Sequence, residues 1–194
     1  MKIPKTTKGL KTKALIFEKS IALIKEKGFS DVTLQDLCKA SGVANGTFYH
    51  YFSSTTDILR ELIHKEVEDL EVFYQNLSCP SCYEKLFAVL DYMLDYYELK
   101  GRDIVASIQI NALKQGIGIV DPYLECTAKL IIETIRDGQE TGEFSGEFTP
   151  EFHAVNIQSL ILYKAAEWIL EYKDTPLSEL TKDHLRTEVS RMCI

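Results

Sequence analysis

The chain has 194 residues, of which 45% are hydrophobic and 26% charged, the balance of a globular protein that buries a core. No stretch approaches the roughly 18 apolar residues of a membrane helix, and no apolar run follows the lysine-rich start as in a secretory signal. Five cysteines, an odd and scattered set, argue against a secreted disulfide framework. A cytoplasmic protein without a membrane partner is therefore expected.

The net charge of −7 is unevenly distributed along the chain. Residues 1–56 carry nine lysines against four acids, whereas the remaining 138 residues carry 13 bases against 25 acids. The first part is therefore +5 and the second −12. A basic head on an acidic body indicates two functional parts with different partners.

The first predicted helix spans residues 10–27. Its apolar residues recur at spacings of three and four, which places them on one helix face: Ala14, Phe17, Ile21 and Ile24. Gly28 follows where a helix commonly ends in a left-handed residue.

Later helix starts are indicated by capping chemistry. A hydroxyl stands three residues before a carboxylate, the spacing of a capping box, at Thr33 and Asp36, Ser54 and Asp57, and Ser81 and Glu84. A capping side chain precedes a proline at the first helical position in Asp121-Pro122, Thr149-Pro150 and Thr175-Pro176.

These patterns predict an all-α protein of about nine helices, without a strand. The predicted helices span residues 10–27, 34–41, 45–52, 55–77, 81–99, 102–115, 121–141, 150–172 and 177–191. The apolar segment 117–120 is too short and too closely flanked by glycine for a strand.

The second and third predicted helices are short and flank a turn at Ser41-Gly42, the pattern of a helix-turn-helix. One set of side chains is predicted to pack inward: Leu37, Cys38, Val43, Phe48 and Phe52. The opposite face presents groups suited to base edges and phosphates: Asn45, Gly46, Thr47, Tyr49 and His50. An aromatic corner in an ordinary helix bundle is the alternative, but it leaves the basic head unexplained.

The segment VTLQDLCKASGVANGTFYHYFSSTTDIL resembles the DNA-binding head of the tetracycline-repressor (TetR/AcrR) family of transcriptional regulators. The threonine, the Gly-Val corner and the aromatic cluster fall at the family's spacings, and the match covers residues 10–60. The resemblance implies a helix-turn-helix DNA-binding domain over 1–54 and an effector-binding and dimerisation domain over 55–194. It also implies DNA contacts by Thr33, Gln35, Ala44, Asn45, Gly46, Thr47, Tyr49 and His50.

One departure from the family pattern concerns charge. Many members have a lysine shortly after the aromatic cluster, where this chain reads Ser53-Ser54-Thr55-Thr56. The amino-terminal lysines are candidates to replace that contact at phosphate or in the minor groove: Lys2, Lys5, Lys8, Lys11 and Lys13.

The body is expected to hold a pocket for a small-molecule effector. Its aromatic-rich helix 81–99 and the neighbouring helices supply candidate lining residues: Tyr92, Tyr96, Gln109, Tyr123, Cys126 and Tyr163. For any one of these residues taken alone, ordinary core packing is the favoured explanation.

The segment 154–170 is apolar on more than one face, more than one helix needs to cover its own core. A second buried face indicates a partner, so a homodimer formed through the last two helices is expected. A two-fold dimer presents two recognition helices to successive turns of the major groove and therefore predicts double-stranded DNA with a palindromic operator.

No residue pattern indicates a cofactor, a metal site or catalysis. Cys79-Pro-Ser-Cys82 could be a thiol switch or half a zinc site, but no second ligand pair accompanies it, and an incidental pair in a loop is the simpler interpretation. The four histidines show no metal or catalytic spacing.

The sequence thus predicts a DNA-binding transcriptional regulator, a repressor that a small-molecule inducer releases from its operator. The alternative is a helical carrier or enzyme in which the body does the work. Salt-sensitive binding to DNA separates the two.

Overall fold

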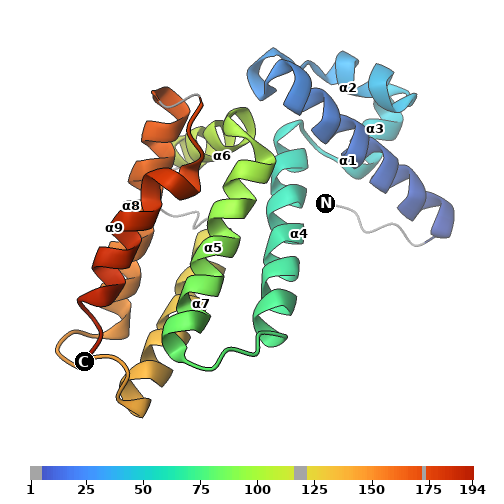
Figure 1. Ribbon diagram of the computed structural model, residues 1–194. Helices are drawn as coiled ribbons and strands as arrows, with labels where there is room; N and C mark the ends of the chain where they lie inside the picture. Colours follow the sequence, from blue (N-terminus) through green and yellow to red (C-terminus); the bar gives the residue numbers. More distant parts are fainter. Residues whose placement is uncertain (1–5, 116–121, 172–173) are drawn as a thin grey trace.

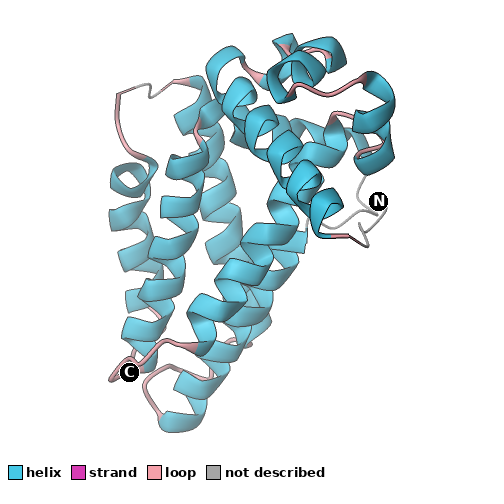
Figure 2. Ribbon diagram, turned by 90° about the vertical axis from the view of Figure 1, so that its right-hand side faces the viewer, coloured by secondary structure: helices cyan, strands magenta, loops and turns pink. Residues whose placement is uncertain are grey.

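The computed structural model describes residues 6–115, 122–171 and 174–194, and in these ranges it is helical throughout (Figures 1 and 2). The one strand-like pairing within them is an isolated antiparallel bridge between Phe144 and Cys193. None of the helices in this part of the chain is long and apolar enough to cross a membrane. The all-α prediction is confirmed.

The head contains three helices and a short 3₁₀ turn, and a fourth helix leads out of it. They are α1 (Thr7–Lys27), η1 (Phe29–Asp31), α2 (Leu34–Ser41), α3 (Asn45–Tyr51) and α4 (Thr56–Gln75). The body adds α5 (Cys82–Lys100), α6 (Arg102–Gln115), α7 (Pro122–Thr141), α8 (Pro150–Leu170) and α9 (Leu177–Ser190).

Three helix starts follow the predicted capping residues. At α2 the Asp36 amide donates to the Thr33 hydroxyl (3.2 Å) and the Thr33 amide donates to the Asp36 carboxylate (3.0 Å), which completes a capping box. Ser81 and Thr149 cap α5 and α8 in the predicted way. These caps depend on neighbours three residues away, so the local sequence is enough to predict them.

Three starts differ from the prediction. The first helix begins at Thr7 because Thr6 caps it, accepting from the amide of Gly9. The last helix begins at Leu177 with Pro176 in the cap position, so Thr175 does not cap it. Helix α4 begins at Thr56 with Thr55 in the cap position and no side-chain cap bond, so Ser54 is not its cap residue, although the Asp57 amide donates to the Ser54 hydroxyl at 3.3 Å. Asp121, the expected cap of α7, lies outside the described residues, so that prediction is not tested.

The helices enclose two hydrophobic clusters. The head cluster joins α1, α2 and α3 to the first half of α4, and it contains Ile16, Leu37, Phe48, Phe52 and Leu62. The body cluster joins the second half of α4 to the helices from α5 onward. Helix α4 therefore belongs to both clusters and connects them.

In the body, α5 and α7 run side by side, with α8 and α9 on one side and α4 on the other (Figure 1). The head lies at one end of this bundle, and the carboxyl terminus lies at the opposite end. Ile104, at the start of α6, is fully buried in the head cluster although α6 belongs to the body. The head and the body are therefore packed together, and the chain between them is not a free linker.

Candidate DNA interface and effector region

A sharp turn sets the direction of α3. Gly42 ends α2 in the left-handed region (φ +67°), where its amide donates to the carbonyls of Cys38 and Lys39. The amide of Val43 also donates to the carbonyl of Cys38, at 3.0 Å. A residue with a Cβ would be strained at position 42, so the glycine is a requirement of the turn.

One face of α3 is anchored in the head cluster. Phe48 and Phe52 are completely buried, and their ring centroids lie 5.7 Å apart. Leu37 and Cys38 of α2 are buried in the same cluster, and Val43 is half-buried against it. The predicted inward-facing set is confirmed.

The other face of α3 is open to solvent. Ala44, Asn45, Gly46, Tyr49 and His50 are exposed, and Thr47 is half-buried. Tyr49 is 56% exposed, and neither its hydroxyl nor the His50 imidazole hydrogen-bonds to any described residue. The short helix thus presents a row of unused donors and acceptors.

Gly46 differs from most of the glycines that the structure describes, in that nothing in the fold requires it. A Cβ at this position would meet no atom within 4 Å, and its φ is not positive. Glycine weakens a helix relative to alanine. The protein's own packing therefore does not account for a glycine at this position.

The two α2 candidates lie beside this face. Gln35 is exposed in the first turn of α2. Thr33 is exposed as well, but its hydroxyl and amide are both bonded to Asp36 in the capping box. These hydrogen bonds lower the pKa of the Asp36 carboxyl, with the Thr33 hydroxyl as the main cause. Thr33 therefore fixes the start of α2.

The lysine candidates divide into three groups. Lys8 and Lys11 are exposed on α1, whereas Lys2 and Lys5 lie outside the described residues. Lys13 is different: its ammonium pairs with Glu61 of α4 at 2.5 Å, and the two side chains are only 14% and 15% exposed. Lys13 therefore joins α1 to α4 and is not available to phosphate.

Arg60 is a cation that the sequence analysis did not single out. It is the first base after the aromatic cluster, which was the available signal, and its side chain is 55% exposed in the second turn of α4. Asp57 holds it at 2.5 Å and also accepts from the amide of Ser53 at 2.7 Å. Arg60 is thus a positioned cation close to the Ser53–Thr56 segment.

In the body, the structure brings together the candidates on α5 and α7. The rings of Tyr96 and Tyr123 stack with centroids 4.3 Å apart, and both are buried. Cys126 is buried one turn after Tyr123, and Tyr92 stacks on Phe73 of α4 at 4.5 Å. Burial raises the pKa of Tyr123 far above its usual value, with Tyr97 and Tyr96 as further causes, so this phenol stays protonated.

The remaining two effector candidates, Gln109 and Tyr163, lie on other helices than the α5–α7 tyrosines. Gln109 is half-buried on α6. Tyr163 is 62% exposed on α8, about half a turn away from Ile161 and Ala165, which face the core. The structure therefore does not group Tyr163 with the α5–α7 tyrosines.

An ion pair next to the tyrosine cluster was also missed from the sequence. Lys100, at the end of α5, pairs with Glu66 of α4, and the two side chains are 12% and 14% exposed. The Lys100 ammonium lies 5.4 Å from the centroid of the Tyr96 ring. Because the partners are 34 positions apart in sequence, no local pattern predicts this contact.

The Cys79 and Cys82 thiols are free and half-buried. Burial, followed by the charge of Glu143, raises the pKa of the Cys82 thiol, which disfavours the reactive thiolate. Within the described ranges, no group of three or more His, Cys, Asp and Glu residues is placed to hold a metal.

The sequence of the head matches the model of a known protein family. A family model described as "Bacterial regulatory proteins, tetR family" matches residues 16–62. These residues run from the middle of α1 to Leu62 of α4, which is nearly the extent of the head cluster.

Two curated relatives extend the similarity along the chain. The uncharacterized HTH-type transcriptional regulator YfiR of Bacillus subtilis (strain 168) is 29% identical over 154 residues, covering 76% of this chain and 74% of the relative. A second regulator described in the same way and from the same organism, YvdT, is 25% identical over 198 residues, covering 97% of each chain.

Solved structures share the whole architecture. FadR from Bacillus subtilis, in complex with stearoyl-CoA, has a TM-score of 0.73 at 20% identity, over 91% of this chain and 97% of that one. A transcriptional regulator from Saccharomonospora viridis, in complex with choline, has a TM-score of 0.74 at 18% identity, over 93% and 96%. At these identities the likeness shows a common fold.

Proposed function

Because this chain belongs to the TetR family of bacterial regulatory proteins, we propose that it is a homodimeric repressor that binds a palindromic operator and releases it when a small molecule binds the body. Helix α3 supplies the reading surface. The observation that carries the proposal is the exposed face of α3, with unbonded Tyr49 and His50 beside a glycine that the fold does not need.

In this proposal the contacts divide by role. Asn45, Thr47, Tyr49 and His50 reach base edges and phosphates from α3, and Gly46 allows the helix start to approach the DNA. The exposed bases Lys8, Lys11 and Arg60 contact phosphate and fix the register of the head on the DNA. The exposed Gln35 side chain assists them. Such contacts make the affinity strongly dependent on salt.

The dimer is proposed to form through the outer face of α8. Its inner face is buried against the body, whereas an exposed apolar stripe follows the outer face: Phe152, Val155, Tyr163 and Leu170. A helix that is apolar on two faces needs a second partner. The same stripe on a second copy supplies it in a two-fold arrangement.

The effector is proposed to bind among Tyr92, Tyr96, Tyr123 and Cys126. FadR and the Saccharomonospora regulator bind ligands as different as stearoyl-CoA and choline on this fold, so the fold does not select the ligand. The buried tyrosines favour a ligand with an apolar body and a polar group that reaches their hydroxyls. In this proposal the body binds its ligand without catalysing a reaction. The protein then works in the cytoplasm, where bacterial DNA lies.

Two contacts are placed to pass a change in the body to the head. Ile104 of α6 is buried in the head cluster, and the Lys25 ammonium of α1 donates to the carbonyl of Leu99 at 3.0 Å. An effector that shifts the end of α5 or the start of α6 therefore displaces α1. By thermodynamic linkage, the effector weakens DNA binding by the same factor by which bound DNA weakens the binding of the effector.

The test is a mobility-shift titration of the purified protein against the DNA upstream of its own gene, at two salt concentrations. We expect specific, salt-sensitive binding by a dimer, and about a tenfold or greater loss for Tyr49→Ala and for His50→Ala. His64→Ala, an exposed histidine of α4, is the matched control and keeps wild-type affinity. Native affinity in both α3 variants would refute the assignment of this surface.

A further inference from the structure

A groove between α5 and α9 lies outside the region described above. It encloses about 510 Å³, within the roughly 300–1,000 Å³ of small-molecule sites. Phe87 and Leu94 of α5 and Leu185 of α9 form its apolar walls. Leu94 and Leu185 are buried, so the floor of the groove belongs to the packed core.

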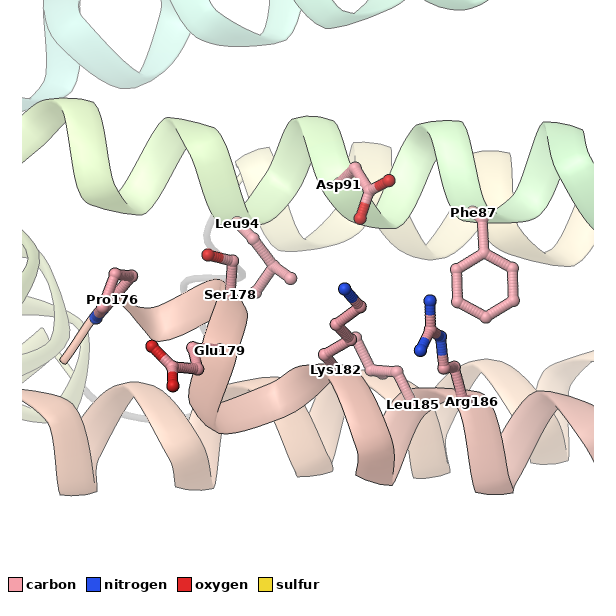
Figure 3. Close-up of a pocket in the computed structure, with 9 residues that line it drawn as sticks. All are labelled: Phe87, Asp91, Leu94, Pro176, Ser178, Glu179, Lys182, Leu185 and Arg186. Atoms are coloured by element: carbon pink, nitrogen blue, oxygen red, sulfur yellow. The ribbon is translucent and has the colours of Figure 1, made fainter.

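Two cations face this groove from one helix. Lys182 and Arg186 stand one turn apart on α9, and both side chains point toward α5 (Figure 3). Like charges at this spacing destabilise a helix. The pair is also unusual because it lies in a body whose net charge is −12.

Two acids line the groove together with the cations, Asp91 of α5 and Glu179 of α9. Asp91 points toward Lys182 and Arg186 in Figure 3, whereas Glu179 points away from them. Burial, followed by the charge of Asp95, raises the pKa of the Asp91 carboxyl, and the charges of Lys182 and Arg186 partly offset that rise. Within the described residues, neither Lys182 nor Arg186 forms an ion pair with Asp91. All three charged side chains are exposed to solvent along the groove, so the cations remain open to an incoming anion.

The groove is separate from the two surfaces already assigned. Tyr92 and Tyr96 lie on the side of α5 that faces α4 and α7, whereas Asp91 and Leu94 lie on the side that faces α9. The apolar stripe of α8 lies on neither wall. A ligand in the groove can thus coexist with an effector among the α5–α7 tyrosines and with a dimer partner on the apolar stripe of α8.

We propose that the α5–α9 groove binds a small amphipathic anion, a carboxylate or phosphate that carries an apolar group. The anionic group lies between Lys182 and Arg186, and the apolar group lies on Phe87 and Leu185. A guanidinium offers a planar fork of donors that matches both anions, and the ammonium adds a second charge. Asp91 offsets part of the positive charge of the empty site and competes with the incoming anion.

The test is isothermal titration of the full-length protein, without DNA, with benzoate, phenyl phosphate and inorganic phosphate. We expect saturable binding of benzoate or phenyl phosphate, and the stronger of the two identifies the anionic group. Lys182→Gln and Arg186→Gln should each weaken this binding about tenfold or more. Lys129→Gln, which removes an exposed lysine of α7, should leave it unchanged.

Asp91→Asn separates a binding site from a purely structural charge cluster. In a binding site, loss of the competing carboxylate tightens anion binding. In a structural cluster, the same change only lowers the unfolding temperature. The proposal is overturned by weaker binding in Asp91→Asn, by equal losses in Lys129→Gln, by equal affinity for inorganic phosphate, or by the absence of saturation in the wild type. None of these variants touches the head, so operator binding is tested independently.

Discussion

At position 46 an added methyl group meets no atom of the protein within 4 Å, and the backbone does not require glycine. Replacing glycine by alanine in a helix stabilises it by up to about 1 kcal/mol. We therefore expect Gly46→Ala to raise the unfolding temperature slightly and to weaken operator binding roughly tenfold, because the methyl group occupies the space for DNA. Thermal unfolding and a mobility-shift titration measure the two effects.

Gly146 provides the control for this experiment. It too has open space at its Cβ and no positive φ, but it lies in the body between α7 and α8. Gly146→Ala should leave operator affinity unchanged. If Gly46→Ala binds DNA as tightly as Gly146→Ala, then α3 does not approach DNA at this position.

His153 couples stability to pH. Its side chain is 7% exposed on α8, and its Nδ1 is buried without a hydrogen-bond partner among the described residues. Burial lowers its pKa below the model-peptide value of 6.5, an effect that Glu188 partly offsets. The unfolded chain therefore takes up this proton first as pH falls, so the folded state loses stability below about pH 6.5.

His153→Leu should remove that part of the pH dependence. The expected result is a smaller drop in unfolding temperature between pH 7.5 and 5.5 than in the wild type, measured by calorimetry in buffers of equal ionic strength. His184→Leu alters an exposed histidine of α9 and should keep the wild-type drop. Equal drops in all three proteins would show that His153 takes up its proton as readily in the folded state as in the unfolded chain.

At the scale of the secondary-structure elements, the features that the sequence predicted are those that depend on residues a few positions apart. Thr33 with Asp36, and Ser81 with Glu84, are three residues apart, so the chain itself brings them together. The two faces of α3 follow in the same way from the spacing of Phe48 and Phe52. These features decide several helix starts and which face of α3 is exposed, and both were predicted.

What the sequence did not predict depends on contacts between elements. Lys13 was taken for a DNA contact, because no local pattern reveals its ion pair with Glu61, which is 48 positions away in the sequence. Tyr163 was a pocket candidate as a residue of a neighbouring helix. Helix α8 is apolar on two faces, and periodicity does not distinguish the core face from the outer one. The Glu66–Lys100 pair and the insertion of Ile104 into the head cluster depend on tertiary packing in the same way.

Ile104 allows the connection between body and head to be tested. Ile104→Ala removes a fully buried side chain and should cost about 2–5 kcal/mol, with faster amide hydrogen exchange in α1 and η1, which α6 contacts. Ile161→Ala makes the same change in the body cluster and should accelerate exchange in α7 and α8 instead. Identical exchange patterns would mean that the two clusters unfold as one unit and that α6 has no special role.

At the scale of the whole molecule, two features bear on DNA binding, the charge distribution and the exposed apolar stripe of α8. A body of net charge −12 repels DNA, so binding depends on two heads held together by a dimer. Val155→Asp places a buried charge in the proposed interface and should give a monomer in analytical ultracentrifugation, with an unchanged helical spectrum. Val72→Asp, at a valine of similar exposure on α4 (59% against 61%), should remain dimeric.

The salt dependence of DNA binding then connects the dimer to its function. The logarithm of the affinity falls by about 0.9 per phosphate neutralised for each tenfold rise in salt, and a dimer neutralises twice as many phosphates as one head. We therefore expect the Val155→Asp monomer to bind operator DNA weakly, with about half the salt slope of the Val72→Asp control. An unchanged slope in a monomeric Val155→Asp protein would mean that one head makes all the phosphate contacts. The palindromic operator would then lose its physical basis.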